Sequence, residues 1–174
     1  MTLQEAITLI RDKNIISDSK NVWADLGCGS GLFTYALAGL LHGESTIYAI
    51  DKIISSFKIT SFFTKVTIKT VEMDFEKENF PFKDLDGILM ANSLHFVKDK
   101  KSFFENIKSS LNNNGCFLIV EYNTEVPNPW VPYPINFSSL KRLLNNAGYS
   151  FVTKINERPS AFNKGNLYSA IIRR

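Results

Sequence analysis

The sequence predicts an α/β fold: a single doubly wound, seven-stranded sheet with helices on both faces and a terminal antiparallel strand pair. Two observations lead to this prediction. Short apolar runs alternate repeatedly with amphipathic segments, as in parallel sheets that carry helices on both faces. The chain then closes with two strand-like runs, 149–155 and 167–172, without a helical pattern between them. Only antiparallel neighbours can be joined by so short a connection.

The parallel strands are expected where apolar residues run without interruption. Such runs indicate strands that are buried on both faces. The third run, VTIKTV, alternates instead, which indicates an edge strand or a strand with one wet face. The five expected strands are 22–26, 46–50, 66–71, 88–91 and 117–120.

Helical patterns precede and separate these strands. Thr2 and Glu5 have the spacing of a capping box, ahead of an apolar stripe formed by Leu3, Ile7 and Ile10. Further stripes predict helices over 32–40, from 53 to about 63, over 103–111 with a stop at the Asn-Asn-Asn-Gly of 112–115, and over 140–147.

Length and composition place the chain among ordinary globular proteins. Its 174 residues favour one domain, 1–174, and 44% of them are apolar. No apolar run reaches the roughly 20 residues of a membrane helix, so a cytoplasmic protein without a membrane partner is expected. The net charge of +3 is too small to argue for nucleic acid, which is not an expected partner. Two cysteines are too few for a metal cluster, and no metal is expected.

A glycine loop follows the first strand and reads DLGCGSG over 25–31. In open α/β sheets, ligands bind beyond the carboxyl ends of the strands, where alternate glycines let the backbone turn and a ligand approach. A dinucleotide loop needs a third glycine at position 32, which is Leu32 here. The loop suits a zwitterion better, because helix-start amides can face a carboxylate while Asp25 takes up an ammonium group, directly or through water. The alternative is a mere turn.

Two further carboxylates follow the second and third strands. Asp51 can accept hydrogen bonds from both hydroxyls of a ribose, or it can be the N-cap of a helix that begins at Lys52. Asp74 can accept from the exocyclic amine of adenine while the amide and ring of Phe75 contact the base. Its alternative role is that of an ordinary loop aspartate.

These positions together resemble the class I S-adenosylmethionine-dependent methyltransferases over nearly the whole chain. The matching stretches are 22–31, 47–51, 74–75, 91–96 and 111–121. The resemblance implies a Rossmann-like methyltransferase fold with S-adenosylmethionine as cofactor. The Asn-Ser-Leu-His stretch at 92–95 is most similar to the ubiquinone/menaquinone-biosynthesis-type branch, whose members act mainly on small molecules. The cofactor-binding residues that the resemblance implies are Asp25, Gly27, Cys28, Gly29, Gly31, Asp51, Lys52, Asp74, Phe75, Ala91 and Asn92.

Some family patterns are missing. The Asn/Asp-Pro-Pro-Tyr/Phe sequence of amino-methylating enzymes is replaced by Ala-Asn-Ser-Leu at 91–94. Glu121 and Asn123 alone would make a poor divalent-metal site. No inserted cap is present either, so the substrate wall must come from residues 1–21, from the 122–136 loop or from a partner subunit, as in a homodimer.

The acceptor side is expected after the fourth strand. Asn92 and His95 are the candidate catalytic residues there, with His95 as a base for the acceptor proton or, alternatively, a packing or surface histidine. Tyr122, Trp130 and Tyr133 are candidates to wall an apolar substrate or to pack on the sheet. Three functions remain open: a small-molecule methyltransferase, a methyltransferase for protein or RNA, and a non-catalytic cofactor-binding partner subunit.

Overall fold

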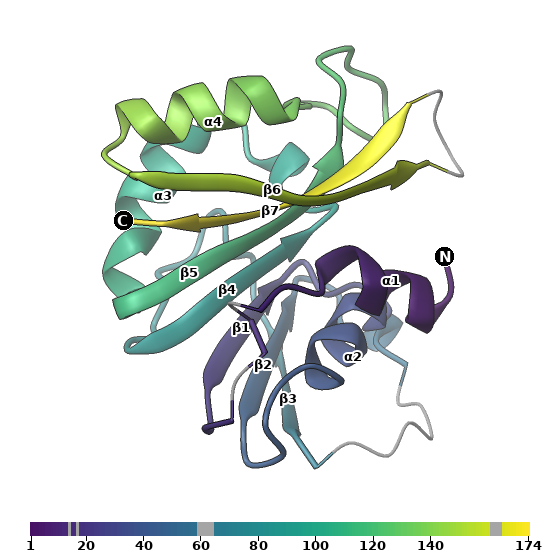
Figure 1. Cartoon of the computed structure of the whole chain (residues 1–174), viewed down its shortest axis with the longest axis vertical. Helices are drawn as coiled ribbons and strands as arrows, with labels where there is room; N and C mark the ends of the chain where they lie inside the picture. The colour runs from purple at the N-terminus through teal and green to yellow at the C-terminus, as the bar shows by residue number, and fades with distance from the viewer. Residues whose placement is uncertain (14, 17, 59–64, 161–164) are drawn as a thin grey trace.

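The computed structural model describes residues 1–13, 15–16, 18–58, 65–160 and 165–174. Seven strands form one sheet in the order β3-β2-β1-β4-β5-β7-β6 (Figure 1). The first five strands run parallel, and β7 is antiparallel to both β5 and β6. This confirms the predicted fold and its terminal strand pair. The strands are β1 Val22–Leu26, β2 Thr46–Asp51, β3 Thr67–Glu72, β4 Leu85–Ala91, β5 Leu111–Tyr122, β6 Phe151–Pro159 and β7 Asn166–Arg173.

Burial explains the difference between alternating and solidly apolar strands. β3 lies at one edge of the sheet, and only Ile68 and Val71 of it are half-buried while its other residues are exposed. β4 and β5 lie in the middle and are buried on both faces. Of the two alternatives predicted for the third strand, an edge strand or a strand with one wet face, the structure shows an edge strand.

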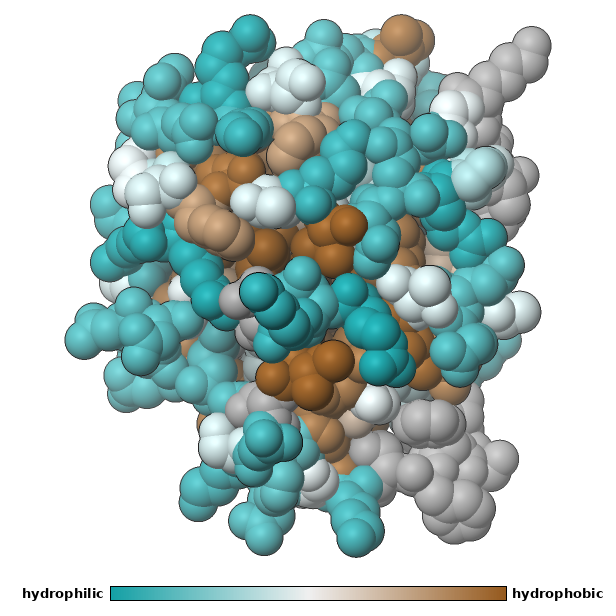
Figure 2. All heavy atoms as spheres, in the orientation of Figure 1, coloured by the Kyte–Doolittle hydropathy of each residue, from teal (hydrophilic) through white to brown (hydrophobic). Residues whose placement is uncertain are grey.

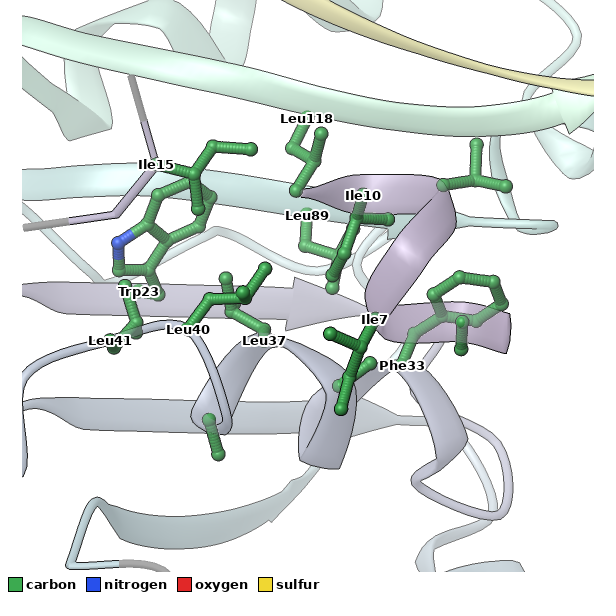
Figure 3. Packing of buried hydrophobic residues seen from close by; sticks show 14 of the residues in the cluster. Ile7, Ile10, Ile15, Trp23, Phe33, Leu37, Leu40, Leu41, Leu89 and Leu118 are labelled. Atoms are coloured by element: carbon green, nitrogen blue, oxygen red, sulfur yellow. The ribbon is translucent and has the colours of Figure 1, made fainter. Parts of the chain in front are cut away.

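Within the described part of the chain, two helices cover each face of the sheet. α1 (Leu3–Ile10) and α2 (Leu32–Ala38) pack on one face, and α3 (Lys100–Ile107) and α4 (Phe137–Asn146) pack on the other. β1 contributes to both cores, since Trp23 faces α1 and α2 whereas Ala24 and Leu26 face the opposite side. Figure 3 shows the first core, where Ile7, Ile10, Phe33 and Leu37 of the helices meet Leu89 and Leu118 of the sheet.

α1 is fixed at both ends. Thr2 and Glu5 form the predicted capping box at its start. At its end, Nδ2 of Asn156 donates to the carbonyl oxygen of Leu9 at 3.1 Å, and Oγ of Ser169 donates to the same oxygen at 2.6 Å. These side chains from β6 and β7 satisfy a carbonyl that the helix itself leaves without a partner.

The structure corrects two helix predictions. The Asn-Asn-Asn-Gly segment at 112–115 does not end a helix but belongs to β5, because α3 stops at Ile107 and a 3₁₀ turn covers Lys108–Ser110. Asn112 fits the strand because its side-chain amide donates to Oδ1 of Asp86 at 2.7 Å.

The helix expected from residue 53 is also different. It is only a 3₁₀ turn at Ile54–Ser56, and its later part lies outside the described residues. The helix expected over 32–40 ends at Ala38.

The described residues show no membrane-spanning helix and a largely polar surface on the side seen in Figure 2. None of their helices is long and apolar enough to cross a membrane. Figure 2 shows the side of the molecule on which α1, α2, β6 and α4 are visible in Figure 1 as mostly hydrophilic, with hydrophobic residues in separate small areas. Cys28 and Cys116 are both buried and free of disulfides.

Candidate functional site

Strand order reverses between β1 and β4, and a cavity of about 270 Å³ lies at the carboxyl ends of these strands. Such a switch point is where open α/β sheets bind ligands. The lining residues come from the loops after four neighbouring strands and are Gly27, Gly29, Asp51, Lys52, Met73, Asp74, Phe75, Glu76, Asn92, Ser93 and Phe96.

The three loop glycines have separate roles. All three have positive φ angles, 77° at Gly27, 52° at Gly29 and 89° at Gly31. A Cβ on Gly27 would lie 2.5 Å from Cβ of Ser93, and one on Gly31 would lie 2.7 Å from the ring of Phe57. A Cβ on Gly29 would meet no protein atom within 4 Å. Gly27 and Gly31 therefore permit close packing, while Gly29 leaves space open beside the cavity.

Four of the predicted cofactor residues do not line this cavity. They are Asp25, Cys28, Gly31 and Ala91. The backbone of two of them shapes the loop instead, since the amide of Cys28 donates to the carbonyl of Ile50 at 3.0 Å and the amide of Gly31 donates to that of Cys28 at 2.9 Å.

Asp51 joins the end of β2 to the glycine loop. Its Oδ2 accepts from the amide of Gly29 at 2.9 Å, and its Oδ1 accepts from the amide of Ile53 at 3.0 Å. The predicted alternative, an N-cap for a helix at Lys52, is wrong, because the 3₁₀ turn begins only at Ile54 and has no side-chain cap. Each carboxylate oxygen retains a further lone pair, so Asp51 can still accept from a ligand in the cavity that it lines.

Asp74 and Phe75 close the cavity beyond β3. Oδ1 of Asp74 accepts from the amide of Glu76 at 3.2 Å, and Oδ2 lies 3.6 Å from Nζ of Lys77. Asp74 thus braces its own loop and also lines the cavity. The Phe75 ring packs edge-on against Phe103, with 6.1 Å between the ring centroids.

Two buried acceptor atoms lack hydrogen-bond partners within the described part of the chain: Oδ1 of Asp25 and Oδ1 of Asn92. Oδ2 of Asp25 accepts from Oγ1 of Thr34 at 2.6 Å. Burial, with a smaller contribution from the charge of Asp51, raises the pKa of Asp25 to about 7. An unpaired buried acceptor is costly, so these atoms suit a ligand that brings a hydrogen-bond donor or a positive charge.

Asn92 directly follows β4 and has a backbone φ of 55°. Its amide donates to the carbonyl of Val120 at 2.8 Å, which holds the residue at the strand end. A left-handed conformation is uncommon outside glycine, but asparagine tolerates it better than most residues. Asn92 also lines a second cavity, so the two hollows meet at this residue.

The second cavity has a volume of about 520 Å³ and lies between β5, the turn after β4 and the 127–134 loop. Tyr122 and Trp130 line it as predicted, whereas Tyr133 does not. The lining residues are Asn92, His95, Tyr122, Asn128, Pro129, Trp130 and Val131.

His95 lies in this second cavity and faces a carboxylate. The residue is 3% exposed, and Nδ1 of its ring lies 2.9 Å from Oε2 of Glu121. His95 is therefore not the surface histidine that was one alternative, and its buried contact with Glu121 is compatible with a base and with a packing residue. Sequence reasoning considered Glu121 only as a metal ligand and missed this pairing. The available signal was one acidic residue within the apolar run FLIVEY at the end of β5.

The fold is that of a Rossmann-like α/β protein with one cavity at the switch point of the sheet, where such folds bind ligands, and a second cavity beside it. A family profile described as "Methyltransferase domain" matches residues 24–119. Because the match covers more than half of the chain, the chain belongs to this methyltransferase family. It is a class I methyltransferase, and its cofactor is S-adenosylmethionine.

Solved structures share the fold at low sequence identity. DhpI, in complex with SAH, is 16% identical with a TM-score of 0.67, and the match covers 97% of this chain and 82% of that one. A precorrin-6y C5,15-methyltransferase from Geobacter metallireducens is 14% identical with a TM-score of 0.68, over 99% and 87% of the two chains. The magnesium protoporphyrin IX methyltransferase of Synechocystis, with bound SAH, is 14% identical with a TM-score of 0.66, over 99% and 82%. No curated protein sequence matches the chain.

Proposed function

We propose that this chain, acting as one domain over residues 1–174, transfers the methyl group of S-adenosylmethionine to a small molecule. The observation that carries the proposal is the meeting of two cavities at Asn92. One cavity has the features expected for the cofactor, and the other is open to an acceptor on the far side of the same residue. Methyl transfer requires this adjacency, because the nucleophile, the methyl carbon and the sulfur must be aligned.

The residues of the first cavity fit the parts of the cofactor. Asp51 offers acceptors for the ribose hydroxyls, and Asp74 with Phe75 offers an acceptor and a ring for the adenine. The unpaired oxygens of Asp25 and Asn92 fit the α-ammonium group, with Asp25 acting through water because it does not line the cavity. The bound cofactor supplies an electrophilic methyl group, and these residues orient it. Gly27, Gly29 and Lys52 would line its path, while Cys28, Gly31 and Ala91 would shape the loop and strand ends around it.

The second cavity favours a small acceptor over RNA. Among the described residues, its lining has no lysine or arginine, and the lining of the first cavity has only Lys52 beside the three acids Asp51, Asp74 and Glu76. An RNA enzyme needs a continuous basic surface around its pocket. The names of the precorrin and magnesium protoporphyrin methyltransferases also denote small acceptors for those two proteins. Membership of the ubiquinone/menaquinone-type branch is part of this proposal and rests on the stretch at 92–95. A cytoplasmic location and a homodimer stay predictions.

Ligand-induced stabilisation tests the cofactor and its competitors. S-adenosylmethionine or S-adenosylhomocysteine at 100 times its dissociation constant should stabilise the fold by about 2.7 kcal/mol and raise the melting temperature by roughly 5–10 °C. NAD, NADP and ATP should have little effect. A shift with NAD alone would overturn the proposal. Incubating the enzyme and methyl-labelled cofactor with either a metabolite extract or total RNA then shows by mass spectrometry which fraction gains the label.

A further inference from the structure

The second cavity contains a buried carboxylate–imidazole pair. His95 is 3% exposed and Glu121 is 1% exposed. Nδ1 of His95 lies 2.9 Å from Oε2 and 3.1 Å from Oε1 of Glu121. A carboxylate can only accept, so the neutral imidazole carries its proton on Nδ1 and keeps the lone pair on Nε2. Because Nδ1 is engaged by Glu121, Nε2 is the nitrogen left to meet a molecule in the cavity that His95 lines.

The backbone around His95 is held on both sides, which fixes the ring relative to the cavity. The His95 amide donates to Oε1 of Glu121 at 3.0 Å, and the His95 carbonyl accepts from the amide of Tyr133 at 3.0 Å. The buried ammonium of Lys100 ties the same segments together, since it donates to the carbonyls of Val97 at 2.8 Å and Tyr133 at 2.6 Å. Such backbone and side-chain contacts position a functional group more precisely than a free loop can.

The rest of the cavity favours a flat, uncharged acceptor. Tyr122 and Trp130 provide aromatic rings, and Pro129 and Val131 provide apolar surface. Apart from the histidine, the polar lining consists of the amides of Asn92 and Asn128 and the hydroxyl of Tyr122. A cavity of about 520 Å³ lies within the range of small-molecule sites, roughly 300–1,000 Å³.

We propose that this cavity binds an aromatic alcohol and that His95, positioned by Glu121, removes the hydroxyl proton during methyl transfer. The proposal rests on the proposed function. The acceptor oxygen gives its proton to Nε2 of His95 and forms the new O–CH₃ bond, while the sulfur of the cofactor keeps the electron pair of the broken S–CH₃ bond. The imidazolium that forms is stabilised by the Glu121 carboxylate. His95 is then the catalytic residue and Glu121 a positioning residue.

The tautomer of His95 is the first readout, because it depends on Glu121 and does not require turnover. The chain has only two histidines, so ¹⁵N-histidine NMR of the protein saturated with S-adenosylhomocysteine resolves both rings. At a pH where both are neutral, His95 should carry its proton on Nδ1. The exposed His42 is an internal reference with the opposite tautomer. Its Nδ1 accepts from the amide of Glu44 at 3.3 Å, so its proton should lie on Nε2.

Glu121→Gln should reverse the His95 tautomer. The glutamine oxygen should take the place of Oε1, because the His95 amide donates there at 3.0 Å, closer than the Tyr122 amide at 3.3 Å from Oε2. The NH₂ group then faces Nδ1, which must accept, and the proton moves to Nε2. Amide replacement of a buried carboxylate beside a catalytic histidine is known to impair catalysis in this way. A wild-type protein with the proton on Nε2, or an unchanged tautomer in Glu121→Gln, would overturn the proposal.

Methyl transfer to two matched probes is the second readout. 2-Naphthol needs a base near neutral pH, whereas naphthalene-2-thiol is already ionised and does not. Wild-type protein should methylate both. Glu121→Gln and His95→Gln should lower transfer to 2-naphthol by about 10²–10⁴-fold and leave transfer to the thiol within about threefold. Glu105→Gln, an exposed carboxylate on α3, is the control and should change neither rate.

Each remaining outcome decides against one specific claim. Equal losses for both probes in Glu121→Gln would mean a structural role for the pair. Transfer to the thiol alone, or to neither probe by a protein that binds the cofactor, would overturn the aromatic-alcohol proposal. A protein that does not bind S-adenosylhomocysteine at all would instead refute the proposed function.

Discussion

The two cavities share Asn92 but are built from different parts of the chain and by different means. The first depends on backbone conformation, as the open position of Gly29 shows, and on carboxylates at successive strand ends. The second depends on side chains that converge from β5, from the turn after β4 and from the 127–134 loop. A site shaped by the backbone suits a ligand that stays the same across a family. A site shaped by side chains can change its ligand through single substitutions. The difference suggests that the cofactor side is shared within the family and that the acceptor side sets what this chain methylates.

Gly29→Val should abolish cofactor binding without changing the second cavity, and it should have the largest effect of the three substitutions. The side chain would enter space that is open beside the cavity, so binding of S-adenosylhomocysteine should fall by more than about 100-fold, over 2.7 kcal/mol. Calorimetric titration measures this loss. Gly148→Val is the matched control, because Gly148 also has a positive φ, 86°, and open space around its Cβ, but it lies after α4 and away from both cavities. Both variants should lose similar stability, and only the first should lose binding.

Asp25→Asn should separate cofactor binding from fold stability. Burial raises the pKa of Asp25 from 3.8 to about 7, so between these values the folded carboxyl keeps its proton while the unfolded one ionises. The free energy of unfolding therefore falls as pH rises through this window and levels off above it. Removing the ionisable group should stabilise the protein at pH 8 by up to about 4 kcal/mol relative to wild type, with little difference at pH 4.

The same Asp25→Asn variant should bind S-adenosylmethionine more weakly. The ionised Asp25 carboxylate destabilises the protein without cofactor, but it would attract the α-ammonium group of the bound cofactor. Urea unfolding at several pH values and calorimetric titration measure the two effects. Asp99→Asn is a control of opposite sign, because hydrogen bonds from Ser102 lower the pKa of Asp99 and its charge stabilises the fold. Parallel pH profiles for wild type and Asp25→Asn would contradict the prediction.

Trp130→Ala should affect only the second cavity, and its effect should be the smallest of the three substitutions. The side chain lines the second cavity but is 77% exposed, so its loss should change unfolding free energy by less than about 0.5 kcal/mol. The KM for 2-naphthol should rise about 2- to 10-fold, the value of one aromatic contact. Val126→Ala, 74% exposed and outside both cavities, should leave KM unchanged. A change in cofactor affinity in Trp130→Ala would mean that the two cavities are not separable.

The sequence identified most of the residues that line the first cavity because their signals are contiguous. The glycine loop, Asp51 and Asp74 each lie at or within two residues of a strand end, and parallel strands bring their carboxyl ends to one edge. The His95–Glu121 pair escaped prediction because its partners are 26 residues apart and meet only through the pairing of β4 with β5. Asn112 was misjudged for a similar reason, since a distant partner, Asp86, makes a polar residue acceptable in a strand.

The contacts that end α1 have a consequence for how the chain folds. Leu9 accepts from Asn156 and Ser169, partners 147 and 160 positions later in the sequence. The ion pair between Glu5 and Arg158 spans 153 positions. Contacts of such high sequence separation carry a large loop-closure entropy and slow the search for the native state. During synthesis α1 can already pack on α2, but the partners of its C-terminal end are absent until β6 and β7 have left the ribosome, so these contacts should be among the last to form.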